Sequence, residues 1–286
     1  MGATGLKETL ARVAFALAAA LSIIAVGLIC LFLFANGIPA MAEIGLPEFL
    51  FGTTWKPGSN MYGIFPMIIG SIYATAGAII VGVPAGLLTA IFLSRFAHAR
   101  VAALLRPGIE LLAGIPSVVY GFFGLMVMVP FIRTHMAGRG LSLLAAAVLL
   151  GIMILPTIIT VAKSALDAVP KSYYEGALAL GATHERAVFR VIVPAAFSGL
   201  MAAVVLGVGR AIGETMAVVM VAGNQPVIPE SIFSGVRTLT ANIVLEMGYA
   251  ADLHRGALIA TGVVLFVFVL LISLLFSAIK KRGEAK

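Results

Sequence analysis

Six apolar stretches of roughly 20 residues constrain the fold of this chain more than any other feature. A helix of about 20 residues is long enough to cross the ~30 Å hydrocarbon core of a bilayer. The predicted membrane spans are residues 13–34, 67–93, 112–132, 141–161, 195–222 and 257–279. The third is the most irregular, because Pro116 and Pro130 interrupt it. The pattern predicts an all-α membrane protein, with residues 1–286 forming one six-helix transmembrane domain.

The composition agrees with a lipid-solvated exterior. Hydrophobic residues make up 61% of the 286 positions and charged residues 11%, and the mean hydropathy is +1.12. A soluble domain carries roughly 25% charged residues. The net charge of +7 does not indicate nucleic-acid binding, because the basic residues flank apolar runs. Cys30 is the single cysteine and the four histidines are scattered, so we expect neither an intrachain disulfide nor a metal site.

The positions of Lys and Arg predict the orientation in a bacterial inner membrane. Basic residues concentrate in cytoplasmic segments. With the N-terminus inside, the segments left outside hold few of them, namely Lys56, Arg133, Arg139, Arg237 and Arg255. Both termini and the long link 162–193 are therefore predicted to be cytoplasmic, and the long segments 36–66 and 223–256 to lie outside.

The cytoplasmic link is predicted to form two short helices that meet at a glycine. Ser172 and Glu175 have the spacing of a capping box, with Ser172 as the N-cap. Gly181 follows where a helix often ends in a residue of positive φ. Thr183 then caps a second helix that runs toward Pro194. A compact helix–glycine–helix hairpin between two spans is the result.

This hairpin resembles the EAA motif of ABC importer permeases. The motif runs E-A-A, three residues, G, nine residues, then I-x-L-P, and this chain has E-G-A, Gly181 and V-I-V-P at the same spacing. The resemblance implies a type I, MetI-like permease core over about residues 67–280, with a coupling hairpin at about 171–193 that docks on an ATPase. An ordinary capped turn is the alternative. The coupling residues that the resemblance implies are Glu175, Gly176, Ala177, Gly181 and Pro194.

Other segments narrow the resemblance to phosphate importers. Residues 110–121 resemble the third span of phosphate permeases, and residues 207–218 resemble their fifth span. The run Thr215-Met216-Ala217, the segment around Trp55 and residues 238–250 resemble the PstC-type subunit. Together these strings cover most of the chain from about residue 49 onward.

The resemblance implies that the chain works with partner subunits. They are a PstA-type permease, a PstB-type ATPase dimer that holds ATP and Mg, a PstS-type external binding protein, and membrane lipid. The chain itself has no P-loop, no paired carboxylates and no nucleophile beside a base, so it is predicted to be neither an enzyme nor a cofactor protein. Two alternatives stay open: a permease for molybdate, tungstate or sulfate, and a self-sufficient secondary transporter or channel.

Arg210 and Glu214 are the strongly ionisable residues expected deep in a span. Each costs roughly 2.5–3.5 kcal/mol at mid-bilayer, so both should face the bundle interior. At i and i+4 of a continuous helix they would lie on one face. Either Arg210 lines the pathway and meets phosphate, or the two form an ion pair that supports packing. Ser117 and Asn224 are further candidates for hydrogen bonds to an oxyanion, with bonds to neighbouring helices as the alternative.

Two pairs of glycines have the G-x-x-x-G spacing that permits close helix contact. They are Gly82 with Gly86, and Gly209 with Gly213. We expect both pairs to serve helix packing.

Overall fold

The computed structural model describes the backbone of residues 3–136 and 138–284, and the side chains of residues 8–136 and 138–278. The terminal basic residues used for the orientation, Lys7, Lys280, Lys281, Arg282 and Lys286, lie outside the described side chains. Helices dominate the described chain. In order, the helices and strands are α1 (Ala3–Ile44), α2 (Leu46–Phe51), β1 (Trp55–Lys56), β2 (Met61–Tyr62), α3 (Phe65–Ile91), α4 (Ala99–Gly114), α5 (Ser117–Phe123), α6 (Val129–His135), α7 (Leu143–Asp167), α8 (Lys171–Ala179), α9 (His184–Ala187), α10 (Val193–Ala195), α11 (Phe197–Gly213), α12 (Met216–Val221), α13 (Leu239–Glu246) and α14 (Asp252–Glu284).

The expectation of an all-α membrane fold is confirmed. Within the described residues, five helical segments are long and apolar enough to cross a membrane, and a bent pair supplies a sixth if it counts as one span. The bent pair is His184–Ala195 with Phe197–Gly213, which meet at 69°. The five segments are Glu8–Ile44, Phe65–Phe96, Ser117–His135, Leu143–Asp167 and Asp252–Ala278.

Two expected spans differ from the structure. The third begins at Ser117 rather than at residue 112, because Ile115 is extended (φ −69°, ψ 126°), as a residue before proline prefers to be. The fifth, expected over 195–222, is broken: α11 ends at Gly213, and Glu214 is extended (ψ 131°) before α12 begins at Met216. Helix α1 also continues about three turns beyond residue 34, where the expected first span ends, and stops at Ile44.

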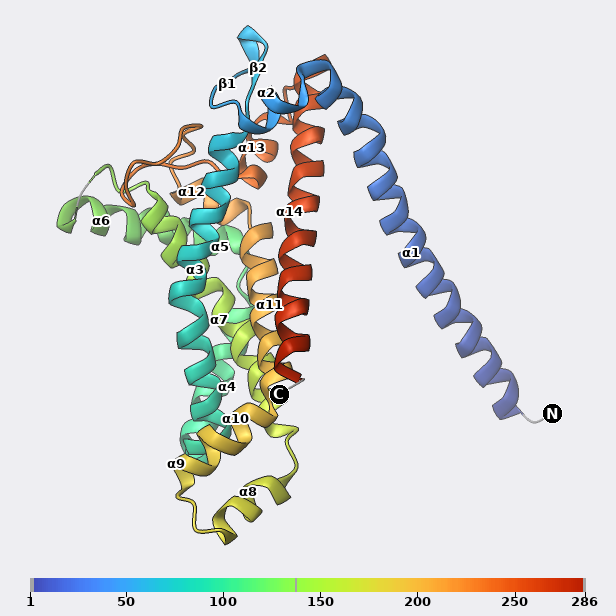
Figure 1. The fold of residues 1–286 in the computed structure, drawn as a ribbon, viewed down its shortest axis with the longest axis vertical. Helices are drawn as coiled ribbons and strands as arrows, with labels where there is room; N and C mark the ends of the chain where they lie inside the picture. The colour runs from blue at the N-terminus through green and yellow to red at the C-terminus, as the bar shows by residue number, and fades with distance from the viewer. Residues whose placement is uncertain (1–2, 137, 285–286) are drawn as a thin grey trace.

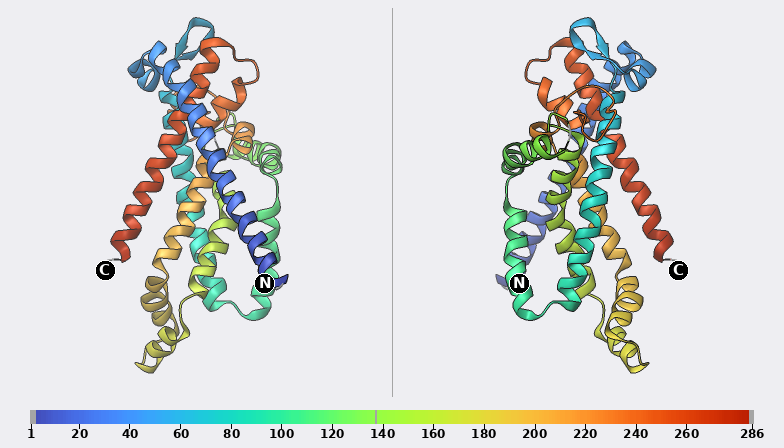
Figure 2. Two further views of the ribbon diagram at one scale, coloured as in Figure 1. Left: turned by 90° about the vertical axis from the view of Figure 1, so that its right-hand side faces the viewer. Right: turned by 90° about the vertical axis from the view of Figure 1, so that its left-hand side faces the viewer.

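The elements form a long bundle with different structures at its two ends. Helices α3, α7, α11 and α14 run side by side along the bundle (Figure 1). The α8–α9 hairpin lies at one end, while β1, β2, α2 and α13 lie at the other (Figures 1 and 2). The start of α1 and the end of α14 point toward the hairpin end. Helix α1 leans away from the bundle and packs on α14 near Gly37, where a Cβ would lie 2.7 Å from Val263 Cγ2.

The contact between α3 and α7 is close because glycines remove the side chain between the two backbones. A Cβ at Gly82 would lie 2.7 Å from the carbonyl oxygen of Gly151, and one at Gly86 would lie 2.8 Å from Ile158 Cγ2. The packing role expected of this pair is confirmed. Gly209 and Gly213 make no such contact within the described chain, where no neighbouring atom lies within 4 Å of a Cβ at either position, so their packing role stays a prediction.

Candidate functional site

The hairpin between α7 and α11 has the predicted glycine turn. Gly181 has φ +81°, and its amide donates to the carbonyl of Leu178 at 2.9 Å. The next amide, of Ala182, donates to the carbonyl of Ala177 at 3.0 Å. These bonds satisfy carbonyls at the end of α8 that would otherwise lack partners. Thr183 is confirmed as the N-cap of α9, because its hydroxyl accepts from the amide of Arg186 at 3.4 Å.

The start of α8 corrects one expectation. Ser172 is not the N-cap: the helix begins at Lys171, Pro170 is the N-cap residue, and no side chain caps the amides there. The amide of Tyr173 instead bonds to the carbonyl of Pro170 at 3.1 Å. Because the proline ring fixes φ near −65°, it sets the entry into the helix two residues earlier than the capping-box spacing suggested.

The far side of the hairpin presents apolar side chains to its surroundings. Leu180 is 91% exposed, Tyr173 52% and Leu178 40%. Glu175 and Gly176 are exposed between them, and Ala177 is half-buried. No described atom lies within 4 Å of a Cβ at Gly176, so this surface is both apolar and low. Apolar side chains exposed on a surface hairpin favour a site of protein interaction.

The near side of the hairpin is fixed to the bundle. The hydroxyl of Tyr174 lies 2.8 Å from Nδ1 of His184, and the His184 ring packs edge-on against Phe96 at 4.7 Å between centroids. Val188 and Ile192, from the π-helical turn Val188–Ile192, are fully buried in a cluster with side chains of α3, α7 and α11. Side-chain contacts therefore connect the hairpin to α3, α7 and α11. Pro194, in α10, is exposed beside this anchor.

The break in the fifth span separates Arg210 from Glu214. Among the described side chains these two form no ion pair, so the pairing expected from a continuous helix is not present. One carboxylate oxygen of Glu214 instead accepts from the amides of Thr215, at 3.2 Å, and Ala217, at 3.3 Å. The carboxylate thereby caps the first turn of α12, a position that favours negative charge.

Arg210 is left with a neutral partner from another helix. Its Nη1 donates to the hydroxyl of Thr157, on α7, at 3.3 Å. The guanidinium is half-buried and retains further N–H donors beyond this bond, since arginine has five. A cation with free donors and no carboxylate at its side can bind an oxyanion.

Ser117 and Asn224 differ in how far their polar groups are already used. Ser117 is half-buried at the first position of α5. Its helix packs on α12, because a Cβ at Gly121 would lie 2.9 Å from Ala217 Cα. Asn224 donates from Nδ2 to the carbonyl of Val219 at 2.7 Å, whereas its Oδ1 is buried without a partner in the described structure.

A polar network at the opposite end was missed by the sequence analysis. Glu246, 7% exposed, accepts from the indole N–H of Trp55 at 2.9 Å and from Arg237 at 2.6 Å, and it lies 2.9 Å from Nε2 of His254. Arg237 also donates to the carbonyl of Asn224 at 2.9 Å. The sequence offered only Trp55 in one outer segment and Glu246 in the other. The two residues are 191 positions apart, and no spacing pattern connects them.

The fold and the exposed hairpin define a multi-pass membrane protein built to dock a partner at one end. A family model described as "Binding-protein-dependent transport system inner membrane component" matches residues 82–283. The chain belongs to this family, the inner-membrane permeases of ABC transporters. Within the described residues, no group of three or more His, Cys, Asp or Glu side chains could hold a metal ion.

Individual relatives agree with this membership. The chain is 43% identical over 283 residues to the probable ABC transporter permease protein YqgH of Bacillus subtilis (strain 168), covering 95% of this chain and 92% of that protein. It is 35% identical over 290 residues to the phosphate transport system permease protein PstC of Mesorhizobium japonicum, covering 94% and 88%. A chain of the inward-facing MetNI methionine ABC transporter has a similar fold, with a TM-score of 0.57 at 23% identity over 77% of this chain and 94% of that one.

Membership settles the class of function. The chain is the permease of an ABC importer, a multi-pass inner membrane protein that works with ATPase subunits and a binding protein, and it is not itself the ATPase.

Proposed function

We propose that this chain is the PstC-type permease of an inorganic phosphate importer. The observation that carries the proposal is Arg210, a guanidinium in the broken fifth span that is bonded to Thr157 and free of Glu214. Its fork of N–H donors suits a tetrahedral oxyanion. The 35% identity to the PstC protein of Mesorhizobium japonicum over 94% of this chain supports phosphate as that anion.

In this proposal residues 67–280 form the permease core, and the chain supplies half of a pathway. A PstA-type permease supplies the other half, a PstB-type ATPase dimer docks on hairpin 171–193, and a PstS-type protein docks on the opposite end. ATP-driven closure of the ATPase pair would move α8, and the anchor at Tyr174 and His184 would carry that motion to the spans. The coupling surface consists of Glu175, Gly176, Ala177, Gly181 and Pro194.

The proposed pathway residues have unequal roles. Arg210 meets the anion, and Ser117 lies on a helix that packs beside α12 and can contribute a hydroxyl. Glu214 acts by capping α12 rather than by neutralising Arg210. Asn224 offers its unpartnered Oδ1, which is an acceptor and therefore suits only a protonated oxygen of the anion.

Uptake of isotopic phosphate in a strain that lacks this chain tests the proposal. Restoring the gene should restore uptake, and excess molybdate, tungstate or sulfate should leave that uptake unchanged. Competition by one of these oxyanions would move the assignment to that anion. Uptake that persists without any ATPase partner would instead favour a self-sufficient transporter.

A further inference from the structure

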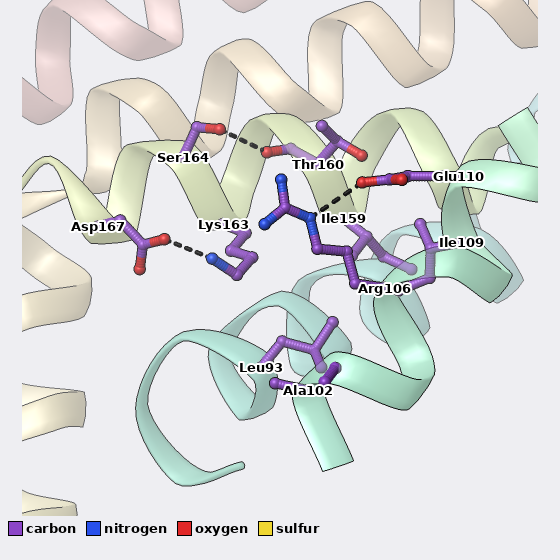
Figure 3. Close-up of a pocket in the computed structure, with 11 residues that line it drawn as sticks. Leu93, Ala102, Arg106, Ile109, Glu110, Ile159, Thr160, Lys163, Ser164 and Asp167 are labelled. Atoms are coloured by element: carbon purple, nitrogen blue, oxygen red, sulfur yellow. Dashed lines mark hydrogen bonds and ion pairs between the residues drawn. The ribbon is translucent and has the colours of Figure 1, made fainter. Parts of the chain in front are cut away.

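A cavity of about 530 Å³ lies between α4 and the second half of α7, and the function proposed above does not use it. Helix α4 lies in the half of the bundle nearer the α8 hairpin (Figure 1). Two cationic side chains line it, Arg106 from α4 and Lys163 from α7, together with the hydroxyl residues Thr160 and Ser164. Figure 3 shows Arg106 and Lys163 reaching from the two helices toward the same space.

Each of these cations is paired, but weakly. Arg106 Nε lies 2.9 Å from Glu110, and Lys163 Nζ lies 2.5 Å from Asp167. Both pairs join residues i and i+4 of one helix, and their side chains are 76% and 64% exposed in the first pair and 35% and 44% in the second. Exposed pairs of this kind contribute little to stability. A multivalent anion that bridges both helices can therefore compete with Glu110 and Asp167 for the two cations, while Asp167 keeps the hydrogen bond that it accepts from Ser94 at 2.5 Å.

The cavity is connected to Arg210 by a polar stripe on an otherwise apolar helix. Thr157, Thr160 and Ser164 are spaced three and four residues apart on α7, so they share one helix face. Thr157 accepts from Arg210 at 3.3 Å, and Ser164 donates to the carbonyl of Thr160 at 2.9 Å at the edge of the cavity. Apolar packing does not require hydroxyl groups at these three positions. The stripe gives a hydrated anion hydrogen-bond partners between one cationic position and the next.

We propose that the cavity is a phosphate-group site in which Arg106 and Lys163 bind the anion from opposite sides. The guanidinium supplies paired N–H donors, the ammonium supplies a compact charge, and Thr160 and Ser164 border the site. The shared chemistry has two possible sources: inorganic phosphate that has passed Arg210, or the headgroup phosphate of an anionic lipid. The first source rests on the proposed phosphate transport, whereas the second does not.

Protection of Lys163 from acetylation measures occupancy directly. The full chain, purified with the subunits that accompany it and placed in phosphatidylcholine nanodiscs, is treated with an amine-acetylating reagent, and the rate at Lys163 is read by mass spectrometry. Lys56, exposed on β1 at the opposite end of the bundle and outside the cavity, is the internal control. Millimolar inorganic phosphate should slow acetylation of Lys163 about threefold, as a site that is two-thirds occupied requires, and should leave Lys56 unchanged.

Two variants and one change of lipid separate the outcomes. Arg106→Gln should abolish the protection, whereas Arg100→Gln, also on α4 but outside the cavity, should retain it. Protection by nanodiscs that contain phosphatidylglycerol, with no effect of inorganic phosphate, would keep the site and assign the lipid as its source. Absence of protection in both lipids, or protection that survives Arg106→Gln, would overturn the proposal.

Measurements of uptake and of Lys163 protection distinguish an error in the proposed transport function from an error in the proposed site. A wild-type complex that takes up no phosphate, yet shows a protected Lys163, would contradict the phosphate permease and leave the site standing. Normal uptake with an unprotected Lys163 would contradict the site alone. If the site lies on the path of the transported anion, the double variant Arg106→Gln/Lys163→Gln should also lower phosphate uptake while the ATPase subunit still copurifies.

Discussion

At the scale of single residues, backbone conformation explains why position 181 is glycine. Gly181 has φ +81°, and no described atom lies within 4 Å of the place where a Cβ would be. Steric contact with neighbours is therefore not the constraint. The left-handed conformation itself costs an L-residue about 1–2 kcal/mol. Any side chain at this turn would also project from the exposed apolar face on which an ATPase is proposed to dock.

The variant Gly181→Leu tests this reasoning. We expect normal insertion and normal abundance in the membrane, but lost phosphate uptake and weaker copurification of the ATPase. Gly176→Ala, within α8 on the same proposed coupling surface, is the comparison: it introduces the alanine that the E-A-A motif has at this position, adds a Cβ in open space, should favour helix formation by about 0.5–1 kcal/mol, and should therefore retain uptake. Normal uptake by Gly181→Leu would argue strongly against a coupling role for the hairpin.

Arg210 makes a second prediction at this scale. Uptake should be lost in Arg210→Ala and poorly restored in Arg210→Lys, since an ammonium lacks the guanidinium fork. Glu214→Gln should impair uptake less, because the neutral amide oxygen can still accept from the amides of α12. Subunit abundance is measured beside uptake in each variant, so that lost transport is distinguished from lost protein.

The double variant Arg210→Ala/Glu214→Ala decides whether the two residues act separately or as an ion pair. Because Arg210 and Glu214 have separate partners, the losses in Arg210→Ala and Glu214→Ala should combine without rescue. An ion pair would give the opposite pattern, with the double variant recovering much of what each single variant loses. Such recovery would remove Arg210 from the proposed pathway.

Local chemistry determines which of these residues could be placed from the sequence. The turn at Gly181 and the cap at Thr183 were predictable because each depends on a few neighbouring residues. The separation of Arg210 from Glu214 was not, because it depends on a distant segment: the hydroxyl of Thr240, on α13, donates to the carbonyl of Glu214 at 3.1 Å. This bond supplies a partner for a backbone group at the break, which the i, i+4 rule for a continuous helix does not anticipate.

At the scale of elements, the α3–α7 contact depends on the absence of side chains. Gly82→Val should place methyl groups against the carbonyl of Gly151 and the side chain of Ile154. Overpacking of this kind costs roughly 1–3 kcal/mol, so we expect a lower thermal unfolding midpoint in detergent and reduced abundance. Gly209→Ala is the control and should leave both unchanged. An unaffected Gly82→Val protein would mean that the two helices separate easily.

The network around Glu246 fixes the outer segments to each other. Glu246→Leu would leave Arg237, whose side chain is 14% exposed, without its carboxylate, and removing one partner of a buried pair costs about 3–5 kcal/mol. Trp55→Phe removes a single hydrogen bond and should cost about 1 kcal/mol. The thermal unfolding midpoint should therefore fall far more in the first variant. Tyr249→Phe, at a residue 71% exposed, is the control for a change at the surface.

At the scale of the whole molecule, the length of the apolar runs made the fold class predictable. The arrangement of the helices depends on tertiary contacts and could not be predicted. Apolar runs of span length have few alternatives to membrane helices, and the class followed from them. The cavity between Arg106 and Lys163 could not be predicted, because the two residues are far apart in sequence and each is flanked by a carboxylate that suggests a solvated helix face. The tilt of α1 away from the bundle could not be predicted either, because its sequence is uniformly apolar and shows no face that would pack on the bundle.

The arrangement of the two ends leads to a prediction about topology. The α8 hairpin and the β1–β2 hairpin lie at opposite ends of the bundle (Figure 1), so a membrane across the long helices must place them on opposite sides. The Lys and Arg distribution predicts that the α8 end lies in the cytoplasm. Leu178→Cys and Gly58→Cys, each in a Cys30→Ser background, place one thiol in each hairpin; Leu178 is 40% exposed, and no described atom lies within 4 Å of a Cβ at Gly58.

An impermeant maleimide applied to the outer side of the membrane should label Gly58→Cys and should label Leu178→Cys only after permeabilisation. The Cys30→Ser protein without either added cysteine measures the background, and phosphate uptake by each variant confirms that the labelled protein is assembled. Labelling of Leu178→Cys from outside would invert the topology. The ATPase could then not reach the α8 hairpin, and the coupling role proposed for Glu175 and Gly181 would fail with it. Because thiol accessibility does not depend on which anion is carried, the test is independent of the substrate assignment.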